Sequence, residues 1–236
     1  IDGRVKALYQ FLEGIARTPI LRDSSVPPEQ KAKYLMDEAN THEEIKILAF
    51  VNNAASLYTY GQKTIQVNHI DYYQASINGN NFLTEPFLSK INGQIILAMS
   101  VPIYDEKRKV IGVLCATLDG LVLCDRTKDI VIGKTGNAYM LGLTGNTIAY
   151  HDRSFVKEVK NMIDEAKKDA STSLSEFLSA ALKSAETEIG YYTYGGVYCI
   201  VSFTKVLTTG RTIVIQAPID EFMGAVQTLR LSIYVI

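Results

Sequence analysis

The chain has 236 residues, of which 47% are hydrophobic and 21% are charged. This composition is typical of a globular protein with a sizeable core and excludes a disordered chain. The 24 basic and 25 acidic residues leave a net charge of −1. The lysines are scattered among the acids, so the basic surface expected of a nucleic-acid-binding protein is absent from the sequence.

The first 44 residues are predicted to be a helical segment. Four apolar residues recur at spacings of three, four and three, a helical stripe of the coiled-coil type: Val5, Leu8, Leu12 and Ile15. Such a stripe either packs on its own domain or forms the seam of a homodimer. Pro19 is expected to end or kink this helix. A second amphipathic helix is expected between residues 24 and 40.

From residue 45 the pattern changes to that of strands. The runs 45–53 and 55–61 are short, apolar and bounded by Asn or Gly, which predicts a strand pair. "DYYQASI" (71–77) predicts a short helix, with Asp71 at the end where free N–H groups favour a carboxylate. The runs 93–105 and 109–120 share the charged turn "DEKRK" and predict a buried hairpin.

The second half repeats this mixture of strands and helices. Two strands are expected within 136–152, helices over 154–168 and 173–185, and three strands within 189–222. A final helix is expected over 223–236, where the chain stops in an apolar run. No apolar run reaches the roughly 20 residues that span a bilayer, and the two ends favour a segment excised between membrane spans.

A weak internal repeat relates residues 93–123 to residues 196–226. Each copy has a glycine, a strand with a serine, a turn, a strand and then an aspartate before a helix start. Ser100 and Ser202 are 102 positions apart, and Asp119 and Asp220 are 101 apart. We therefore predict an α+β protein made of two similar units in tandem, dividing near residue 126.

The residues that usually carry chemistry form no recognisable constellation. The three cysteines lie in or beside apolar runs without metal-ligand spacing, which predicts buried free thiols, with a disulfide between the first two as the alternative: Cys115, Cys124 and Cys199. The three histidines are far apart, and neither a G-x-S-x-G motif nor a carboxylate pair stands out. An enzyme is therefore disfavoured, and no catalytic residue, metal or cofactor is predicted.

"IGKTG" (132–136) is similar to a phosphate-binding loop. That loop needs an earlier glycine, and Lys128 stands at its position. A turn leading into a strand is therefore predicted for Gly133 and Gly136.

"HIDYYQASINGNN" (69–81) combines polar groups with two adjacent tyrosines. Consecutive helical residues point about 100° apart, so Tyr72 and Tyr73 cannot face the same spot. Tyrosine suits a small-molecule pocket because it joins an apolar ring to a polar tip. Core packing explains the pair equally well, and both readings stay open at this point.

In the order and content of three strings, the chain resembles the double Cache domain, the extracytoplasmic sensor module of bacterial chemoreceptors, sensor kinases and cyclic-di-nucleotide enzymes. The strings cover residues 71–120, 132–152 and 212–222. The middle one, "IGKTGNAYMLGLTGNTIAYHD", is the most specific. The resemblance implies an N-terminal helical segment (1–44), a membrane-distal PAS-like unit (45–125), a membrane-proximal PAS-like unit (126–222) and a helix (223–236) toward a membrane span, each unit being an antiparallel sheet flanked by helices.

In this family, small ligands usually bind the membrane-distal unit. The subgroup that binds α-amino acids has an arginine two positions before an aromatic pair and an aspartate in the strand after the hairpin. Here the aromatic pair is Tyr72–Tyr73, Ile70 stands at the arginine position and Thr117 at the aspartate position, with Asp119 two residues further on. A free carboxylate would lack its bidentate arginine, so an uncharged or differently charged metabolite is expected.

The sequence thus predicts the extracytoplasmic ligand-sensing domain of a bacterial transmembrane receptor, most of all a methyl-accepting chemotaxis protein, whose parent is anchored in the membrane. The alternatives are the same domain on a histidine kinase or diguanylate cyclase, an ectodomain without a ligand, and an enzyme such as a hydrolase. A homodimer through the N-terminal helix stays open. Nine residues are predicted to line the pocket: Phe50, Tyr58, Tyr72, Tyr73, Phe87, Ser89, Ser100, Thr117 and Asp119.

Overall fold

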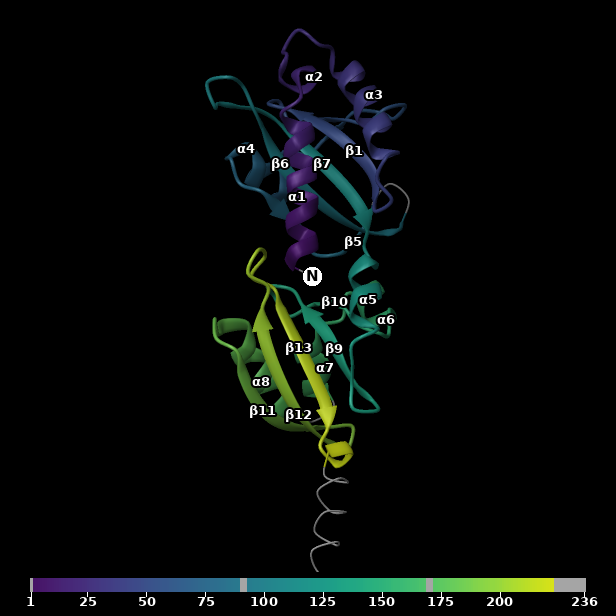
Figure 1. Ribbon diagram of the computed structural model, residues 1–236, viewed down its shortest axis with the longest axis vertical. Coiled ribbons are helices and arrows are strands. Elements are labelled where there is room, and N and C mark those ends of the chain that lie inside the picture. The colour runs from purple at the N-terminus through teal and green to yellow at the C-terminus, as the bar shows by residue number, and fades with distance from the viewer. Residues whose placement is uncertain (1, 90–92, 169–171, 223–236) are drawn as a thin grey trace, which may run out of the picture. The chain divides into compact units, whose positions relative to one another are not determined.

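The computed structural model describes residues 2–89, 93–168 and 172–222. The chain forms two compact units, residues 1–122 and 123–236, and each is built on one antiparallel sheet with flanking helices (Figure 1). The predicted α+β class with two tandem sheets is therefore confirmed. The helix expected over 223–236 lies outside the described residues.

Three helices begin the first unit: α1 (Asp2–Ala16), α2 (Pro19–Arg22) and α3 (Pro28–Ala39). The predicted apolar stripe of α1 is buried, and the helix packs against β6 and β7 of its own sheet. The stripe is thus used inside the unit rather than left free for a partner. Pro19 stands at the first turn of α2, where a missing N–H costs nothing.

The sheet of the first unit has seven strands in the order β3-β2-β1-β7-β6-β4, with β5 also on β6. The long strands were predicted, whereas the two-residue strands are too short to show any periodicity. The strands are β1 (Ile45–Asn52), β2 (Ser56–Tyr58), β3 (Ile65–Gln66), β4 (Phe82–Leu83), β5 (Phe87–Leu88), β6 (Ile95–Tyr104) and β7 (Val110–Asp119). Helix α4 (Asp71–Ile77) forms where the sequence predicted it.

Helices cover both faces of this sheet, so its central strands are buried on both sides. Along β1, Ala49 and Val51 belong to the cluster that packs under α4. Phe50 points the other way, with the Lys31 Nζ of α3 lying 4.7 Å from its ring centre. The buried run "LAFV" (48–51) is continuous because neighbouring residues alternate between two buried faces.

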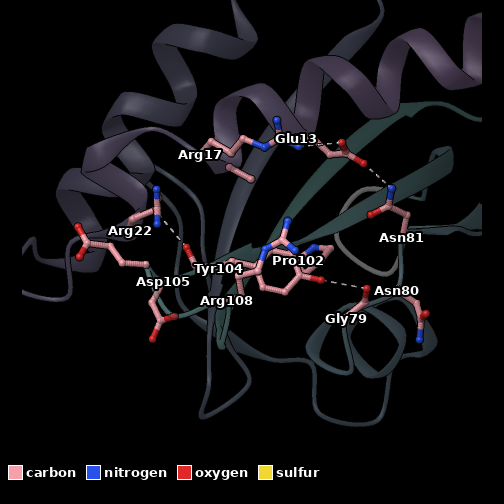
Figure 2. A pocket seen from close by; sticks show the side chains of 12 residues that line it. Glu13, Arg17, Arg22, Gly79, Asn80, Asn81, Pro102, Tyr104, Asp105 and Arg108 are labelled. Carbon is pink, nitrogen blue, oxygen red and sulfur yellow. Dashed lines mark hydrogen bonds and ion pairs between the residues drawn. The ribbon is translucent and has the colours of Figure 1, made fainter.

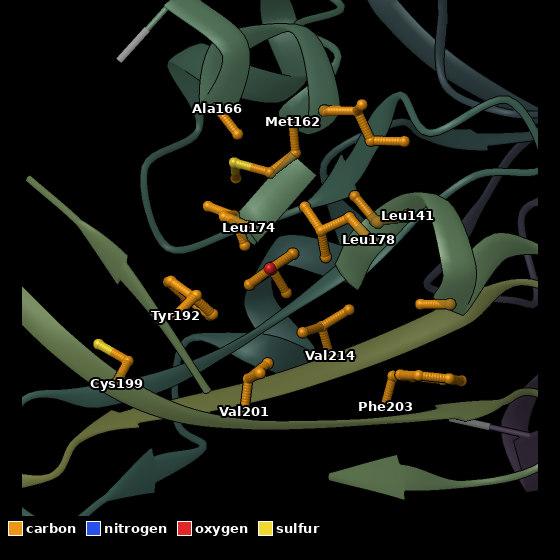
Figure 3. Packing of buried hydrophobic residues seen from close by; sticks show 13 residues of the cluster. Leu141, Met162, Ala166, Leu174, Leu178, Tyr192, Cys199, Val201, Phe203 and Val214 are labelled. Carbon is orange, nitrogen blue, oxygen red and sulfur yellow. The ribbon is translucent and has the colours of Figure 1, made fainter. Parts of the chain in front are cut away.

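The second unit has a six-stranded sheet in the order β10-β9-β13-β12-β11, with β8 also on β9. Its strands are β8 (Val131–Ile132), β9 (Gly136–Leu141), β10 (Thr147–Ala149), β11 (Glu188–Tyr194), β12 (Val197–Lys205) and β13 (Thr212–Pro218). The helices are α5 (Val122–Thr127), α6 (Ser154–Lys157), α7 (Met162–Lys168) and α8 (Thr172–Lys183). One sheet face and the apolar sides of α7 and α8 enclose the core (Figure 3).

The single helix predicted over 154–168 is two helices in the structure. Val159 has a φ of 51°, which interrupts the helical backbone between α6 and α7. Asn161 then starts α7: its Oδ1 accepts hydrogen bonds from the N–H groups of Ile163 (3.0 Å) and Asp164 (3.4 Å). An asparagine side chain that accepts hydrogen bonds from the free N–H groups of a first helical turn caps the start of a new helix.

The internal repeat is real at the level of topology. Setting aside β3 and β8 and counting β4 and β5 as one position, the strands of each unit follow the order 2-1-5-4-3. The serine match inferred from sequence is wrong, however. Ser100 faces α4, whereas Ser202 pairs with Ile189 and Ile215, which are 67% and 40% exposed. Asp119 and Asp220 are related by a shift of 101 residues. With that shift, Ser100 is aligned with Val201, a core residue of the second unit, and residues on the core side of one sheet match residues on the core side of the other.

Replacing the α7 cap should destabilise the second unit. In Asn161→Ala, the cap acceptor and the hydrogen bond from Nδ2 to the Thr144 carbonyl (3.0 Å) are both lost. We expect the free energy of unfolding to fall by about 1 kcal/mol, the usual value of an N-cap. Urea denaturation followed by circular dichroism measures this. Asn161→Asp keeps the acceptor and is the matched control; an equal loss in both variants would rule out the capping role.

Candidate functional site

Helix α4 lies against β6, β7 and β4 on one face of the first sheet. Its N-cap residue, Ile70, makes no side-chain cap hydrogen bond, and Asp71 begins the first turn. Three residues form its buried side: Tyr72, Tyr73 and Ser76. The helix therefore presents two aromatic rings and one hydroxyl to the sheet.

Buried hydroxyl groups anchor α4 to β6. The Oγ atoms of Ser76 and Ser100 are 2.7 Å apart, and both residues are completely buried. Ser100 Oγ lies 2.9 Å from the Tyr72 carbonyl, and Ser76 Oγ lies 2.8 Å from the Asn80 carbonyl. Two hydroxyls carry two protons, so two of these three contacts are hydrogen bonds at any moment. A buried polar group without a partner is costly, so this network fixes the position of the helix.

The two tyrosines have different surroundings. Tyr73 donates from its hydroxyl to the Asn53 carbonyl (3.1 Å), which joins α4 to the turn between β1 and β2. Tyr72 is buried beside Cys115, and burial raises the pKa of both the phenol and the thiol above their ordinary values. Both groups stay neutral at physiological pH. Each tyrosine thus has a packing role, and Tyr73 also has a polar one.

The structure brings most of the nine predicted residues to this face of the sheet. Ser100 and Thr117 face α4 by register, and Phe87 packs against the same cluster as the tyrosines. Ser89 follows β5 and is buried. Asp119 continues this face at the exposed end of β7, where its Oδ1 accepts a hydrogen bond from the Leu121 N–H (2.8 Å).

Two of the nine lie on the opposite face. Phe50 and Tyr58 are register partners whose rings stack with centroids 6.3 Å apart, and Lys31 lies over Phe50 on the side of α3. The continuous apolar run in β1 gave no alternation from which their orientation could be read. The structure does not bring them together with Tyr72 and Tyr73.

The apolar cluster under α4 also contains residues that the sequence analysis did not single out. Val67 is fully buried and donates its N–H to the Ala55 carbonyl (2.9 Å), which folds the irregular segment before α4 onto the sheet. Phe82 and Val113 also belong to this cluster. Residues 59–70 show no periodicity, so no sequence signal identified this segment as a wall of the site.

The face under α4 is almost free of charge. Along β6, β7 and residues 47–52 of β1, all of which the structure describes, the single charged residue whose register faces α4 is Asp119 at the strand end. Lys46 is exposed in the bulge of β1 between Ile45 and Ile47. Ile70 packs at the rim of the cluster. Because a buried ion needs a partner of opposite charge, this arrangement suits an uncharged group or a ligand whose charge reaches Asp119.

A polar groove of about 910 Å³ lies elsewhere on the first unit (Figure 2). It runs between the ends of α1 and α2, the segment after α4 and the hairpin turn of β6 and β7. Asn81 Nδ2 donates to Glu13 Oε1 (2.8 Å), Arg22 Nε donates to the Tyr104 carbonyl (2.9 Å), and the Tyr104 hydroxyl donates to the Gly79 carbonyl (3.2 Å). These bonds join the four segments, and the groove shares no residue with the predicted site.

The sequence of the chain identifies its family. The Cache domain model matches residues 1–226, nearly the whole length. The chain belongs to the Cache domain family. Cache domains are extracellular, ligand-binding sensor domains of membrane receptors and are not catalytic. No curated protein matches this Cache domain by sequence.

Solved structures with the same fold are sensor domains. The extracellular domain of mmHK1S-Z3, a protein assigned as a histidine kinase, has 16% identity and a TM-score of 0.72 over 97% of this chain and 92% of its own. The ligand-binding domain of the Pseudomonas fluorescens chemoreceptor CtaA, in complex with L-serine, has 14% identity and a TM-score of 0.69 over 93% and 91%. That of the Pseudomonas aeruginosa amino acid chemoreceptor PctB, with L-Arg, has 15% and 0.66 over 93% and 89%. At these identities the likeness concerns the fold.

No described helix is both long and apolar enough to cross a membrane, and no group of three His, Cys, Asp or Glu side chains among the described residues could hold a metal ion. All three cysteines are buried free thiols, as the sequence predicted.

Removing the buried hydroxyl on β6 should loosen α4. Ser100→Ala leaves the Tyr72 carbonyl and Ser76 with one fewer buried partner, so we expect a loss of about 1–3 kcal/mol in the free energy of unfolding. Ser202→Ala is the control, because the half-buried Ser202 donates to the Glu188 carbonyl (2.9 Å) in a solvent-exposed hydrogen bond on the second sheet. Urea denaturation compares the two variants. Equal, small losses would show that the buried network does not hold the helix.

Proposed function

We propose that this Cache domain is the extracytoplasmic small-molecule-sensing domain of a bacterial transmembrane receptor, most of all a methyl-accepting chemotaxis protein. Family membership supports a sensor role, and the structural neighbours include chemoreceptor ligand-binding domains. The single observation that carries the proposal is helix α4, a short aromatic helix held over a nearly uncharged sheet face by buried serines. No catalytic role is proposed for any residue.

We place the ligand in the first unit, as the membrane-distal one, between α4 and the sheet. Residues 45–125 would then be the sensing unit and residues 126–222 the membrane-proximal unit. Phe50 and Tyr58 leave the proposed lining because they face α3. The proposed lining residues are Tyr72, Tyr73, Phe87, Ser89, Ser100, Thr117 and Asp119.

The proposed ligand is not a standard α-amino acid. CtaA and PctB are described with amino acids bound, and a free α-carboxylate is best held by a planar, bidentate arginine. In this chain Ile70 stands at the family's arginine position and packs on the apolar cluster. An uncharged metabolite, or one whose cationic group pairs with Asp119, fits the described face better.

The proposed mechanism is a shift between two packings of the first unit. A ligand that contacts both α4 and the sheet favours the arrangement that brings them closest. Movement of α4 must displace its serine anchor on β6, and β6 is paired with β7 along its length. Strand β7 leads through residues 120–121 into α5 and the second unit. A small change in strand and helix packing can therefore travel along the chain toward its C-terminal end.

A thermal-shift screen against metabolites tests the proposed ligand class. We expect some uncharged or cationic compound to raise the melting temperature and the twenty standard amino acids to leave it unchanged. A ligand at 100 times its Kd adds about 2.7 kcal/mol of stability, which is readily measured. Stabilisation by a standard amino acid would overturn the ligand class, and a wholly blank screen would favour a structural ectodomain.

The site itself is tested by a tyrosine variant. Tyr73→Ala should abolish the ligand-induced rise in melting temperature, measured against the variant's own ligand-free value. Tyr60→Ala, at a tyrosine that is 47% exposed, should keep it. If Tyr73→Ala does not fold, Tyr73→Phe removes only the hydroxyl bond to the Asn53 carbonyl and should reduce the rise. Full stabilisation of the Tyr73 variants would show that the ligand binds elsewhere.

The output of the receptor is a separate question. A histidine kinase or a diguanylate cyclase can carry the same sensor, and mmHK1S-Z3 is an example assigned to the first class. The cytoplasmic sequence of the parent protein distinguishes the three. A methyl-accepting signalling region in that cytoplasmic sequence would support the chemoreceptor proposal, and a kinase or cyclase domain would overturn it.

A further inference from the structure

The turn "IGKTG" between β8 and β9 holds a carboxylate. Gly133 has a φ of +67°, which lets the backbone turn so that successive N–H groups point to one spot. Successive N–H groups in such a turn form a concave site for an anion. The sequence was similar to a phosphate-binding loop without its first glycine, and the structure shows which anion occupies the turn.

The occupant is the side chain of Glu221, 86 and 87 residues further along the chain. Its Oε2 accepts from the Lys134 N–H (2.5 Å) and its Oε1 from the Thr135 N–H (3.0 Å). The Thr135 hydroxyl also donates to Oε1 (2.5 Å). We call this set of contacts, Glu221 with residues 133–135, the Glu221 clasp. The carboxylate accepts three hydrogen bonds, and these are stronger than bonds between neutral groups because the acceptor is charged.

Two further observations show that the turn and the glutamate fit each other. A Cβ at residue 133 would lie 2.4 Å from Glu221 Oε2, so a larger residue there would push the carboxylate out of the turn. The Thr135 hydroxyl and the Lys134 N–H hold the pKa of the Glu221 carboxyl below its ordinary value. The group is therefore ionised at neutral pH, which is the form that these donors bind.

The clasp joins the two ends of the sheet-forming sequence of the second unit. Residues 133–135 lie at its first hairpin, and Glu221 follows its last strand, β13, by three residues. Strands β9 and β13 are already hydrogen-bonded neighbours in the sheet. The clasp extends this connection beyond the sheet, to the place where the chain continues into residues 223–236.

We propose that the β8–β9 turn is a carboxylate-binding site whose resident ligand is Glu221, and that this clasp positions the chain as it leaves the second sheet. The site recognises a carboxylate through backbone N–H groups and one hydroxyl. Small free carboxylates such as acetate or formate therefore fit it once the Glu221 side chain is removed. This inference is independent of any ligand in the first unit.

Amide hydrogen exchange of the whole chain tests the clasp directly. In Glu221→Ala, the amides of Lys134 and Thr135 should exchange about tenfold faster or more, the factor expected from loss of a charge-assisted hydrogen bond. Glu176→Ala, at an exposed position of α8, is the matched control and should leave both amides unchanged. Unchanged exchange in Glu221→Ala would overturn the proposal.

Chemical rescue separates a carboxylate site from a merely structural contact. Added acetate or formate should slow exchange of the two amides again in Glu221→Ala, and chloride at equal ionic strength should not. The parent protein and Glu176→Ala should show no such response to acetate. If acetate acts equally on all three proteins, or not at all on Glu221→Ala, the turn is not a carboxylate site.

Milder variants cover the case in which Glu221→Ala does not fold. Glu221→Gln keeps the shape and removes the charge, and Thr135→Val removes one donor while keeping both N–H groups. Each should increase exchange at Lys134 by less than Glu221→Ala does. Parental exchange rates in both variants would overturn the proposal.

Discussion

A small buried polar contact determines the geometry of the first unit. Ser76 and Ser100 place two hydroxyls where water does not reach, so each must find its partner within the protein. Apolar packing alone would let α4 slide on the sheet, because hydrophobic contact is non-directional. The serines remove that freedom. The proposed site, the two tyrosines in it and the link from α4 to the hairpin β6–β7 all depend on this one fixed point.

The elements that the sequence predicted are those long enough to show a period. In α1, α3, β6 and β7 the apolar spacing recurs several times along the element, so the prediction does not depend on any single residue. The break between α6 and α7 depends on Val159 and Asn161 alone, in a segment whose average pattern is helical. Strands of two residues are too short to show a hydrophobic pattern. Strand β4, for example, forms because it pairs with the edge of β6.

Residues of the candidate site could be predicted where a short stretch of sequence is distinctive by itself. They could not be predicted where the result depends on which face of a strand a residue occupies. Tyr72 and Tyr73 stood out because two aromatic residues in a short polar helix are unusual, and both lie on the buried side of α4. Phe50 was misplaced because β1 is apolar on both faces, so its sequence shows no alternation that distinguishes them. The match of Ser100 with Ser202 failed for a related reason, since a shift of one residue moves a side chain to the other face.

The shared strand order has a consequence for how each unit assembles. In the order 2-1-5-4-3 the first and last strands of a unit are neighbours at the middle of its sheet, as β1 and β7 are. The central pairing joins Ile45 to Leu118, near the two ends of the unit's sheet-forming sequence. Contacts between distant segments form slowly because a long loop must close first. A chain emerging from the ribosome or crossing a membrane therefore cannot complete the middle of either sheet until that unit's last strand has arrived.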